Sequence, residues 1–279
     1  MNPIDLPQHT PTIASPPAVG PRAISPAASV RDRVSQQEWA QRVELAACYR
    51  VMDHLGWSEL IYAHTTLAVH GNDRHFLINP YGLRYDEITA SNLVRLDVDG
   101  KVVDDGPHVA NVAGFVIHSA LHLARADAAC VIHTHTTAGM AVAAQKQGLL
   151  PISMYSHNFF GRLGYHDYEG PSLLLGERER LAESLGSNHA LILRNHGLIT
   201  VGRTVAEAFI RMFRLERACQ VQLAAQAGGA QLLLPSPEMC AQSSRLGDQF
   251  LDDGTHGVGQ QEFDAMVRLV EAKDRTFRF

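Results

Sequence analysis

The stretch from Ala129 to Thr137, Ala-Cys-Val-Ile-His-Thr-His-Thr-Thr, joins an apolar run to two histidines. Such a run predicts a buried strand. Because side chains alternate between the two faces of a strand, His133 and His135 should point the same way and Thr134 the opposite way. Two imidazoles on one face can bind a single divalent metal ion, which accepts neutral ring nitrogens without distortion of the strand.

A third ligand is expected from the run at 190–197, Ala-Leu-Ile-Leu-Arg-Asn-His-Gly, where a second apolar strand ends in polar residues and a glycine. If both strands end at the same edge, His196 meets the other two histidines. One histidine at a strand end is more often structural than a ligand, but a pair two residues apart with a matching third favours a metal. The sequence therefore predicts a divalent metal ion held by His133, His135 and His196.

Length and charge limit the other possibilities. The 279 residues are 46% hydrophobic, enough for one domain core of about 200 residues with flanking extensions. The formal net charge of −5 and the lack of a long basic run argue against nucleic acid or an anionic membrane as a partner. The count of 15 histidines is high, so spacing rather than number must single out ligands.

The cysteines and the N-terminus indicate a compartment. Cys48, Cys130, Cys219 and Cys240 are far apart and form no paired motif, which favours reduced thiols. The N-terminus lacks the basic region followed by an apolar region that is typical of a signal peptide. A transmembrane helix needs about 18 consecutive apolar residues, and no stretch of the sequence is that long. A cytoplasmic protein is expected.

The chain divides into three parts by composition. Residues 1–35 are rich in proline and poor in charge, which predicts a mobile segment or one that lies across a neighbouring subunit. Residues 36–235 carry regular periodicity and form the expected domain. Residues 236–279 follow a break at Pro235-Ser236-Pro237 and form a C-terminal extension with a helix.

Helical spacing and extended patterns alternate within the domain. Helices are expected at 36–55, 86–92, 112–126, 137–147, 177–185, 204–227 and 262–272. Strands or extended segments are expected at 62–69, 76–78, 93–98, 129–135, 149–155, 172–175, 190–194 and 198–201. Hairpin signals join several of the strands, so the pattern indicates an α/β/α layered domain with a mainly antiparallel sheet.

These motifs resemble the class II aldolase/adducin family over about residues 38–235. The resemblance rests on the order of His133-Thr134-His135-Thr136, the Asn195-His196-Gly197 turn and the helix after it. Four segments are similar to adducin head segments, which makes adducin-like members the nearest in sequence: 56–62, 77–83, 87–91 and 192–198. The resemblance implies a three-layer α/β/α class II aldolase-like fold and a cyclic tetramer with the active site at the subunit boundary.

The resemblance also implies a metal and its chemistry. His133, His135 and His196 fall on the three zinc ligands of the family, with Mn2+ or Fe2+ as other possible ions. Sugar-phosphate aldolases of the family cleave a carbon–carbon bond through a metal-stabilised enolate. Their base is a glutamate four residues before the position of His118, but here that position is Gly114. The residues that hold the substrate phosphate are not matched either, and His64 lies near the position of an asparagine.

Other candidates could complete a catalytic site. Tyr155 falls near the family's catalytic tyrosine, a proton donor that would reach the metal of a neighbouring subunit, although a half-buried structural tyrosine fits equally well. His118 and His157 are candidates for a substitute base because imidazole accepts a proton near neutral pH. Arg194 and Asn195 should orient the turn rather than touch substrate.

The sequence thus predicts a metal-dependent lyase that acts on a small anionic carbonyl or carboxylate compound by retro-aldol cleavage or decarboxylation. Two alternatives remain. Three histidines without a carboxylate could hold ferrous iron in an oxygenase. The replacement of the glutamate by Gly114 and the adducin-like segments instead favour a non-catalytic, adducin-like assembly module.

Overall fold

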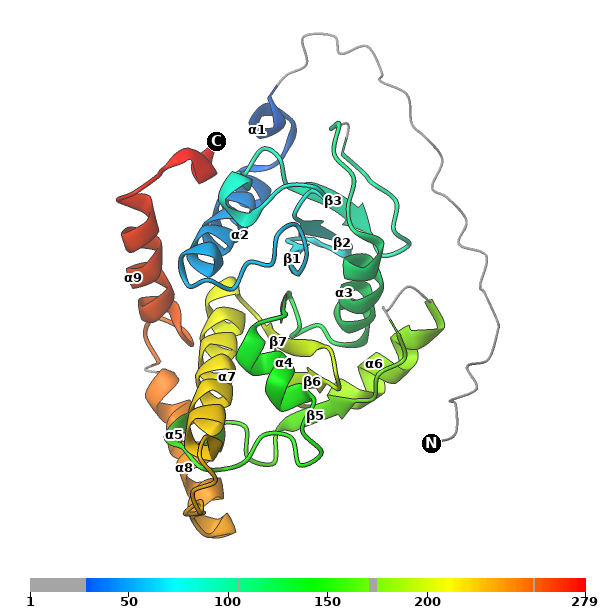
Figure 1. Cartoon of the computed structure of the whole chain (residues 1–279). Coiled ribbons are helices and arrows are strands. Elements are labelled where there is room, and N and C mark those ends of the chain that lie inside the picture. The colour runs from blue at the N-terminus through cyan, green and yellow to red at the C-terminus, as the bar shows by residue number, and fades with distance from the viewer. Residues whose placement is uncertain (1–28, 105, 171–174, 253) are drawn as a thin grey trace.

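The computed structural model of the chain describes residues 29–104, 106–170, 175–252 and 254–279 (Figure 1). The strands are β1 (His64–Val69), β2 (Asn72–Ile78), β3 (Val94–Asp97), β4 (Cys130–Thr134), β5 (Leu163–His166), β6 (Ala190–Leu193) and β7 (Gly197–Gly202). The α-helices are α1 (Val30–Arg33), α2 (Gln36–His54), α3 (Val112–Ala124), α4 (Thr137–Ala143), α5 (Met154–His157), α6 (Arg178–Leu185), α7 (Val205–Gln226), α8 (Pro237–Leu251) and α9 (Gln260–Glu271). Short 3-10 turns are η1 (Tyr85–Glu87), η2 (Leu175–Glu177) and η3 (Thr276–Arg278).

The strands form one sheet in the order β3-β2-β1-β4-β7-β6-β5. Every neighbouring pair is antiparallel except β5 and β6, which are parallel. The predicted mainly antiparallel sheet is therefore confirmed. In its register His133 of β4 lies opposite His64 of β1 on one side and Ile199 of β7 on the other.

Helices cover both faces of the sheet (Figure 1). The larger core joins one face to α2, α4, α7 and α9, and contains Ile132 of β4. The second core joins the opposite face to α3 and α6, and contains Val131 of the same strand. Alternation along β4 therefore puts His133 on the face that α3 covers, and the three-layer α/β/α architecture is confirmed.

Local hydrogen bonds fix the starts of the two longest helices among the described residues. Ser35 accepts a hydrogen bond from the backbone N–H of Glu38 at the start of α2. Thr204 does the same for Glu207 at the start of α7. Both caps satisfy a donor that a helix leaves unpaired.

Several predicted elements are wrong or fall outside the description. The helix at 137–147 ends at Ala143, and the one at 86–92 is reduced to η1. The prediction of an extended segment at 149–155 is wrong at its end. There Ser153 caps the short helix α5 by accepting a hydrogen bond from the backbone N–H of Ser156. Residues 172–174 of the strand expected at 172–175, and residues 1–28 of the proline-rich segment, lie outside the described residues.

Strand β5, helices α1, α5 and α8, and the turn η3 are elements that the sequence did not predict. The C-terminal residues pack on the domain: α9 contacts α2 and α7, and the buried Phe277 of η3 accepts a backbone hydrogen bond from Ala90. All four cysteines are free and buried. None of the helices in the described part of the chain is long and apolar enough to cross a membrane.

Candidate metal centre

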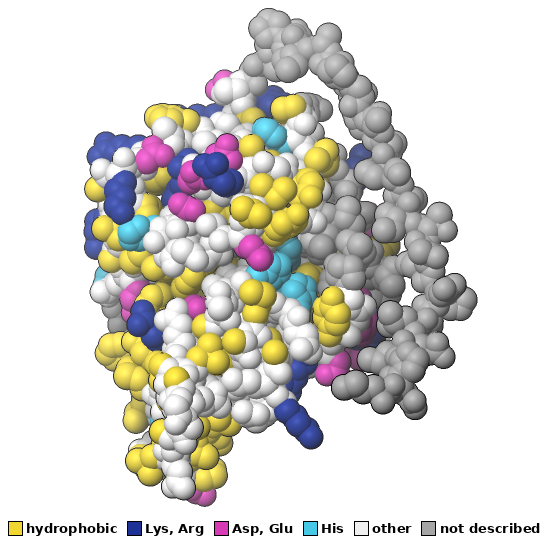
Figure 2. All heavy atoms as spheres, in the orientation of Figure 1, with side chains coloured by type: hydrophobic (Ala, Val, Ile, Leu, Met, Phe, Trp, Pro, Cys, Tyr) yellow, Lys and Arg dark blue, Asp and Glu magenta, His cyan; other side chains and the backbone are white. Residues whose placement is uncertain are grey.

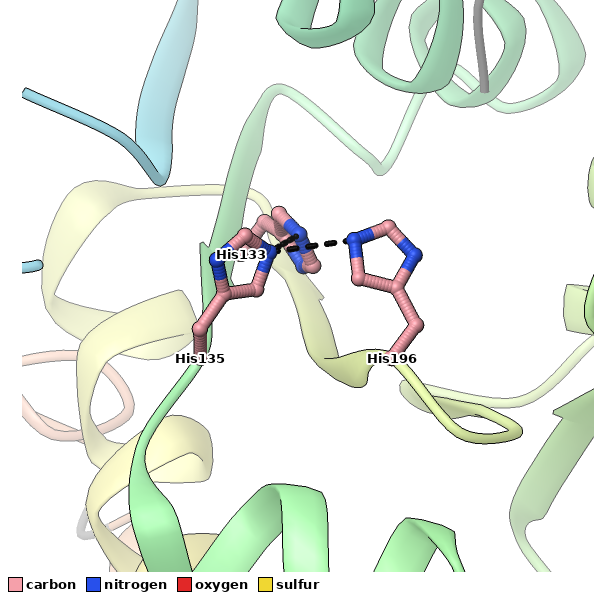
Figure 3. A group of neighbouring side chains, drawn as sticks. All are labelled: His133, His135 and His196. Carbon is pink, nitrogen blue, oxygen red and sulfur yellow. Dashed lines mark hydrogen bonds between the residues drawn. The ribbon is translucent and has the colours of Figure 1, made fainter. Parts of the chain in front are cut away.

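The three predicted histidines meet at one end of the central strands of the sheet (Figure 3). His133 comes from β4, His135 follows the end of that strand, and His196 lies in the turn between β6 and β7. The Nε2 atom of His135 lies 2.7 Å from Nε2 of His133 and 3.0 Å from Nε2 of His196. The structure therefore brings together one nitrogen from each ring, within 4.8 Å of one another.

Hydrogen bonds on the far side of two rings determine what these nitrogens can do. The Nδ1–H of His133 donates to the carbonyl oxygen of Leu198 at 2.9 Å, and the Nδ1–H of His135 donates to Oε2 of Glu59 at 2.6 Å. In a neutral imidazole the other nitrogen then carries a lone pair. Two lone pairs facing each other at 2.7 Å repel unless a cation lies near them, so this donor set fits a divalent metal ion.

The turn that carries His196 depends on a glycine. A Cβ atom at Gly197 would lie 2.4 Å from the carbonyl oxygen of Thr134 and 3.2 Å from Cε1 of His133. Asn195, before His196, has a φ of 55°, a left-handed conformation that asparagine tolerates better than most residues. The Asn-His-Gly sequence therefore lets the turn come close enough for the third ring to reach the other two.

The turn that carries Glu59 is strained. Leu60 and Ala63 have φ values of 52° and 60°, which are uncommon for residues with a Cβ atom. The N–H of Tyr62 donates to the carbonyl oxygen of Glu59 at 2.8 Å and closes the turn. This loop, between α2 and β1, places the carboxylate against His135.

Burial keeps the imidazoles of His133 and His196 neutral. It lowers the pKa of His133 well below its usual value, with the neighbouring His135 and His196 adding to the effect. It lowers the pKa of His196 to about 4, again with a contribution from His135. Neutral imidazole is the form that binds metal. His135 and His196 remain partly exposed, and Figure 2 shows histidine side chains reaching the surface near the middle of the face drawn.

His64 occupies the place beside Gly114. Its ring centroid lies 5.1 Å from that of His133, and a Cβ atom at Gly114 would lie 2.7 Å from its Cδ2 atom. No larger residue at 114 fits beside this imidazole without displacing it. The imidazole of His64 therefore occupies space that a glutamate at position 114 would need.

In the single chain the other predicted site residues are not part of the triad that His133, His135 and His196 form. His118 bonds with one nitrogen to His64 and with the other to Thr66, so it lies one residue behind the site. Tyr155 and His157 lie on α5, which packs against α7 and α8. The ring of His157 is within hydrogen-bond distance of Ser243 and the carbonyl oxygen of Pro151.

Sequence reasoning missed Glu59 and Thr66 as parts of the site. Glu59 is 76 residues from the histidine that it orients, and only its strained turn brings it there. A signal did exist for the α3 side: Gly114, His118 and His122 are spaced by four residues, which places them on one face of a helix.

Comparison with known proteins identifies the family of the chain. Residues 43–223 match the Class II Aldolase and Adducin N-terminal domain, which is more than half of the chain. The chain belongs to the class II aldolase and adducin family.

The relatives of this chain include a protein named as an aldolase and one named as an adducin. A candidate class 2 aldolase of Pseudomonas aeruginosa is 45% identical over 251 residues, covering 90% of this chain and 96% of the relative. Alpha-adducin of Rattus norvegicus is 43% identical over 243 residues, which cover 82% of this chain but 33% of the adducin.

Solved structures show the same fold. An aldolase II superfamily protein from Pseudomonas syringae has 48% sequence identity and a TM-score of 0.82, and the match covers 90% of this chain and 100% of that one. An L-fuculose 1-phosphate aldolase from Glaciozyma antarctica has 28% identity and a TM-score of 0.73, with 91% and 94% covered. The fold of this family member is thus shared with an aldolase.

Proposed function

We propose that this chain is a metal-dependent lyase that cleaves a carbon–carbon bond, by retro-aldol cleavage or decarboxylation, in a small anionic carbonyl or carboxylate compound. His133, His135 and His196 hold the metal ion. Zn2+ is the first choice because three imidazoles with an open position suit catalytic zinc, and Mn2+ or Fe2+ are the other ions considered. Such a cation would act as a Lewis acid that stabilises negative charge on a substrate oxygen.

The observation that carries the proposal is the orientation of the three rings. The Nδ1–H groups of His135 and His133 donate hydrogen bonds to Glu59 and to the carbonyl oxygen of Leu198. Both Nε2 lone pairs are therefore directed at the same place. Three neutral ligands leave the full charge of a cation available to substrate. The similarity to a fuculose phosphate aldolase structure supports lyase chemistry on this fold.

The proton donor in this proposal is Tyr155 of a neighbouring subunit. In the single chain Tyr155 sits on α5, next to Met154, whose side chain is 69% exposed. An exposed apolar side chain at this position fits a subunit boundary. His157, on the same short helix, would also reach a triad only in an assembly, whereas His118 acts through its hydrogen bond to His64.

A second candidate function is a non-catalytic assembly module. It is favoured by the 43% identity to alpha-adducin and by Gly114 at the position of the aldolase glutamate. In that case a metal ion bound by the triad would affect only stability.

The test is elemental analysis of the full chain purified without added metal. We expect close to one divalent ion per chain in the wild type and a loss of that ion in His133→Ala. His70→Ala is the control, because His70 is exposed and its hydrogen bond to Gln41 is made by the backbone N–H, which the substitution keeps. Equal metal content in the wild type and His133→Ala would overturn the proposal, and the identity of the ion would separate zinc from iron chemistry.

A further inference from the structure

A chain of hydrogen-bonded side chains runs from the edge of the triad into the interface between β1 and α3. Nδ1 of His64 lies 2.8 Å from Nε2 of His118, whose Nδ1 lies 2.6 Å from Oγ1 of Thr66. The same Oγ1 lies 2.7 Å from Nε2 of His122, and Nδ1 of His122 lies 2.8 Å from the carbonyl oxygen of Ala128. His64, Thr66 and His118 are buried.

The far end of this chain sets the direction of every bond in it. A carbonyl oxygen can only accept, so the Nδ1–H of His122 donates to Ala128 and leaves Nε2 as an acceptor. The one hydroxyl hydrogen of Thr66 must therefore form the hydrogen bond to Nε2 of His122. Its oxygen then accepts a hydrogen bond from the Nδ1–H of His118.

The near end follows in the same way. Nε2 of His118 is then an acceptor, and the Nδ1–H of His64 donates a hydrogen bond to it. For neutral imidazoles this leaves a lone pair on Nε2 of His64. Among the described residues no hydrogen bond reaches that atom.

The ring of His64 fills the space that Gly114 leaves beside the triad. Nε2 of His64 lies 3.1 Å from the point that a Cβ atom at Gly114 would occupy, and the His64 ring lies beside that of His133. The polar acceptor next to the triad is therefore Nε2 of His64 on strand β1, whereas position 114 on helix α3 offers no side chain.

We propose that Thr66, His118 and His122 hold His64 in the tautomer with hydrogen on Nδ1, and that Nε2 of His64 accepts a hydrogen bond from a hydroxyl group of the substrate. This assignment rests on the proposed function. It narrows the substrate class to compounds that carry a hydroxyl group beside the oxygen that the metal would hold. Thr66, His118 and His122 are positioning residues, and His64 determines specificity.

The tautomer is tested without metal or substrate. Nitrogen-15 spectra of the histidine side chains in the metal-free full chain, assigned by substitution, should show His64 with a protonated Nδ1 and an unprotonated Nε2. Thr66→Val keeps the side-chain shape but removes the hydroxyl hydrogen, so His64 should become a mixture of tautomers. Thr66→Ser keeps the hydroxyl and should restore the single tautomer.

A protonated Nε2 of His64 in the wild type would overturn the inference, and this measurement stands even if Thr66→Val fails to fold. An unchanged tautomer in folded Thr66→Val would also overturn it. These results are independent of metal binding, so a failure of the proposed function remains distinguishable.

Ligand binding tests the acceptor role, with glycolate and acetate as probes on the zinc-loaded chain. Glycolate has a hydroxyl donor and acetate does not. In His64→Leu the preference for glycolate over acetate should fall by about fivefold to tenfold, the size of one net hydrogen bond, while His64→Asn, of similar shape but with an acceptor oxygen, retains most of it. An unchanged preference in His64→Leu, or a zinc-induced shift of Nε2 that marks His64 as a fourth ligand, would overturn the assignment.

Discussion

At the scale of single residues, the candidate site depends on groups that touch no metal. The carboxylate of Glu59 accepts from Nδ1 of His135 at 2.6 Å and fixes which nitrogen of that ring is free. The side chain of Glu59 is 43% exposed, so its direct contribution to folding is small. Its effect should therefore appear in metal binding rather than in stability.

We expect Glu59→Ala to weaken zinc binding by about 10-fold to 100-fold, the usual cost of losing a partner that orients a ligand histidine. The measurement is competition with a chelator of known affinity at a fixed pH. Glu179→Ala, at an exposed position of α6, is the matched control and should bind zinc like the wild type. Equal affinities for Glu59→Ala and the control would show that the carboxylate does not orient the ring.

At the scale of secondary structure elements, the C-terminal segment is an integral part of the packing. Helix α9 covers α2 and α7, and η3 ends the chain against the same helix α2. Arg50 of α2 forms an ion pair with Asp274 at 2.9 Å, and the backbone of Phe277 accepts from Ala90 at 2.9 Å. Residues 260–279 thus pack on α2 and α7 although they lie outside the matched residues 43–223.

Phe277→Ala should lower the free energy of unfolding by about 3–5 kcal/mol, because the ring is fully buried and its loss leaves a cavity. Phe279→Ala removes the same ring two residues later, where it is 70% exposed, and should change stability by less than about 0.5 kcal/mol. Urea unfolding of the three proteins measures both values. Similar losses in the two variants would contradict the packing seen for η3.

The elements also show what could be predicted from sequence. His133 and His135 were predictable because strand alternation alone puts them on one face, and His196 because its strand ends at a recognisable Asn-His-Gly turn. Glu59 was not, since a turn with positive φ at Leu60 and Ala63 has no periodicity. Strand β5 was missed because its four residues pair in parallel with β6 only after the chain has folded.

At the scale of the whole molecule, buried histidines couple stability to pH. Burial lowers the pKa of His122 to about 4, as it does for His196, and lowers those of His64, His118 and His133 well below their usual value. An unfolded chain has histidines that titrate near 6.5. Between about pH 6.5 and 4 the unfolded state therefore binds more protons than the folded state, and stability falls as pH falls.

For the metal-free chain, the free energy of unfolding should decrease by about 1 kcal/mol per neutral histidine between pH 6.5 and 5.5, and so by several kcal/mol in total. Urea titrations in the presence of a chelator measure this dependence. From pH 7.5 to 6.5 these groups should contribute much less. A free energy that stays constant down to pH 5.5 would mean that the histidines are already accessible to protons in the folded state.

The surface of the single chain also carries apolar side chains on the elements next to Tyr155. Met154 of α5 is 69% exposed, and Met239, Leu246 and Phe250 of α8 are 56%, 55% and 78% exposed. Helices α5 and α8 pack against each other, and Figure 2 shows hydrophobic side chains gathered at the lower end of the molecule, where α8 lies in Figure 1. Apolar surface of this kind is typical of an interface.

We expect the wild type to sediment as a tetramer and Met154→Glu to shift it toward smaller species, because a carboxylate at a subunit boundary would be desolvated without a partner. Leu269→Glu on α9 introduces the same charge at a leucine that is 42% exposed, away from α5, and should leave the assembly intact. Sedimentation velocity at several concentrations measures both. If Met154→Glu assembles like the wild type, α5 does not lie at the boundary, and Tyr155 loses its proposed route to the triad of a neighbouring subunit.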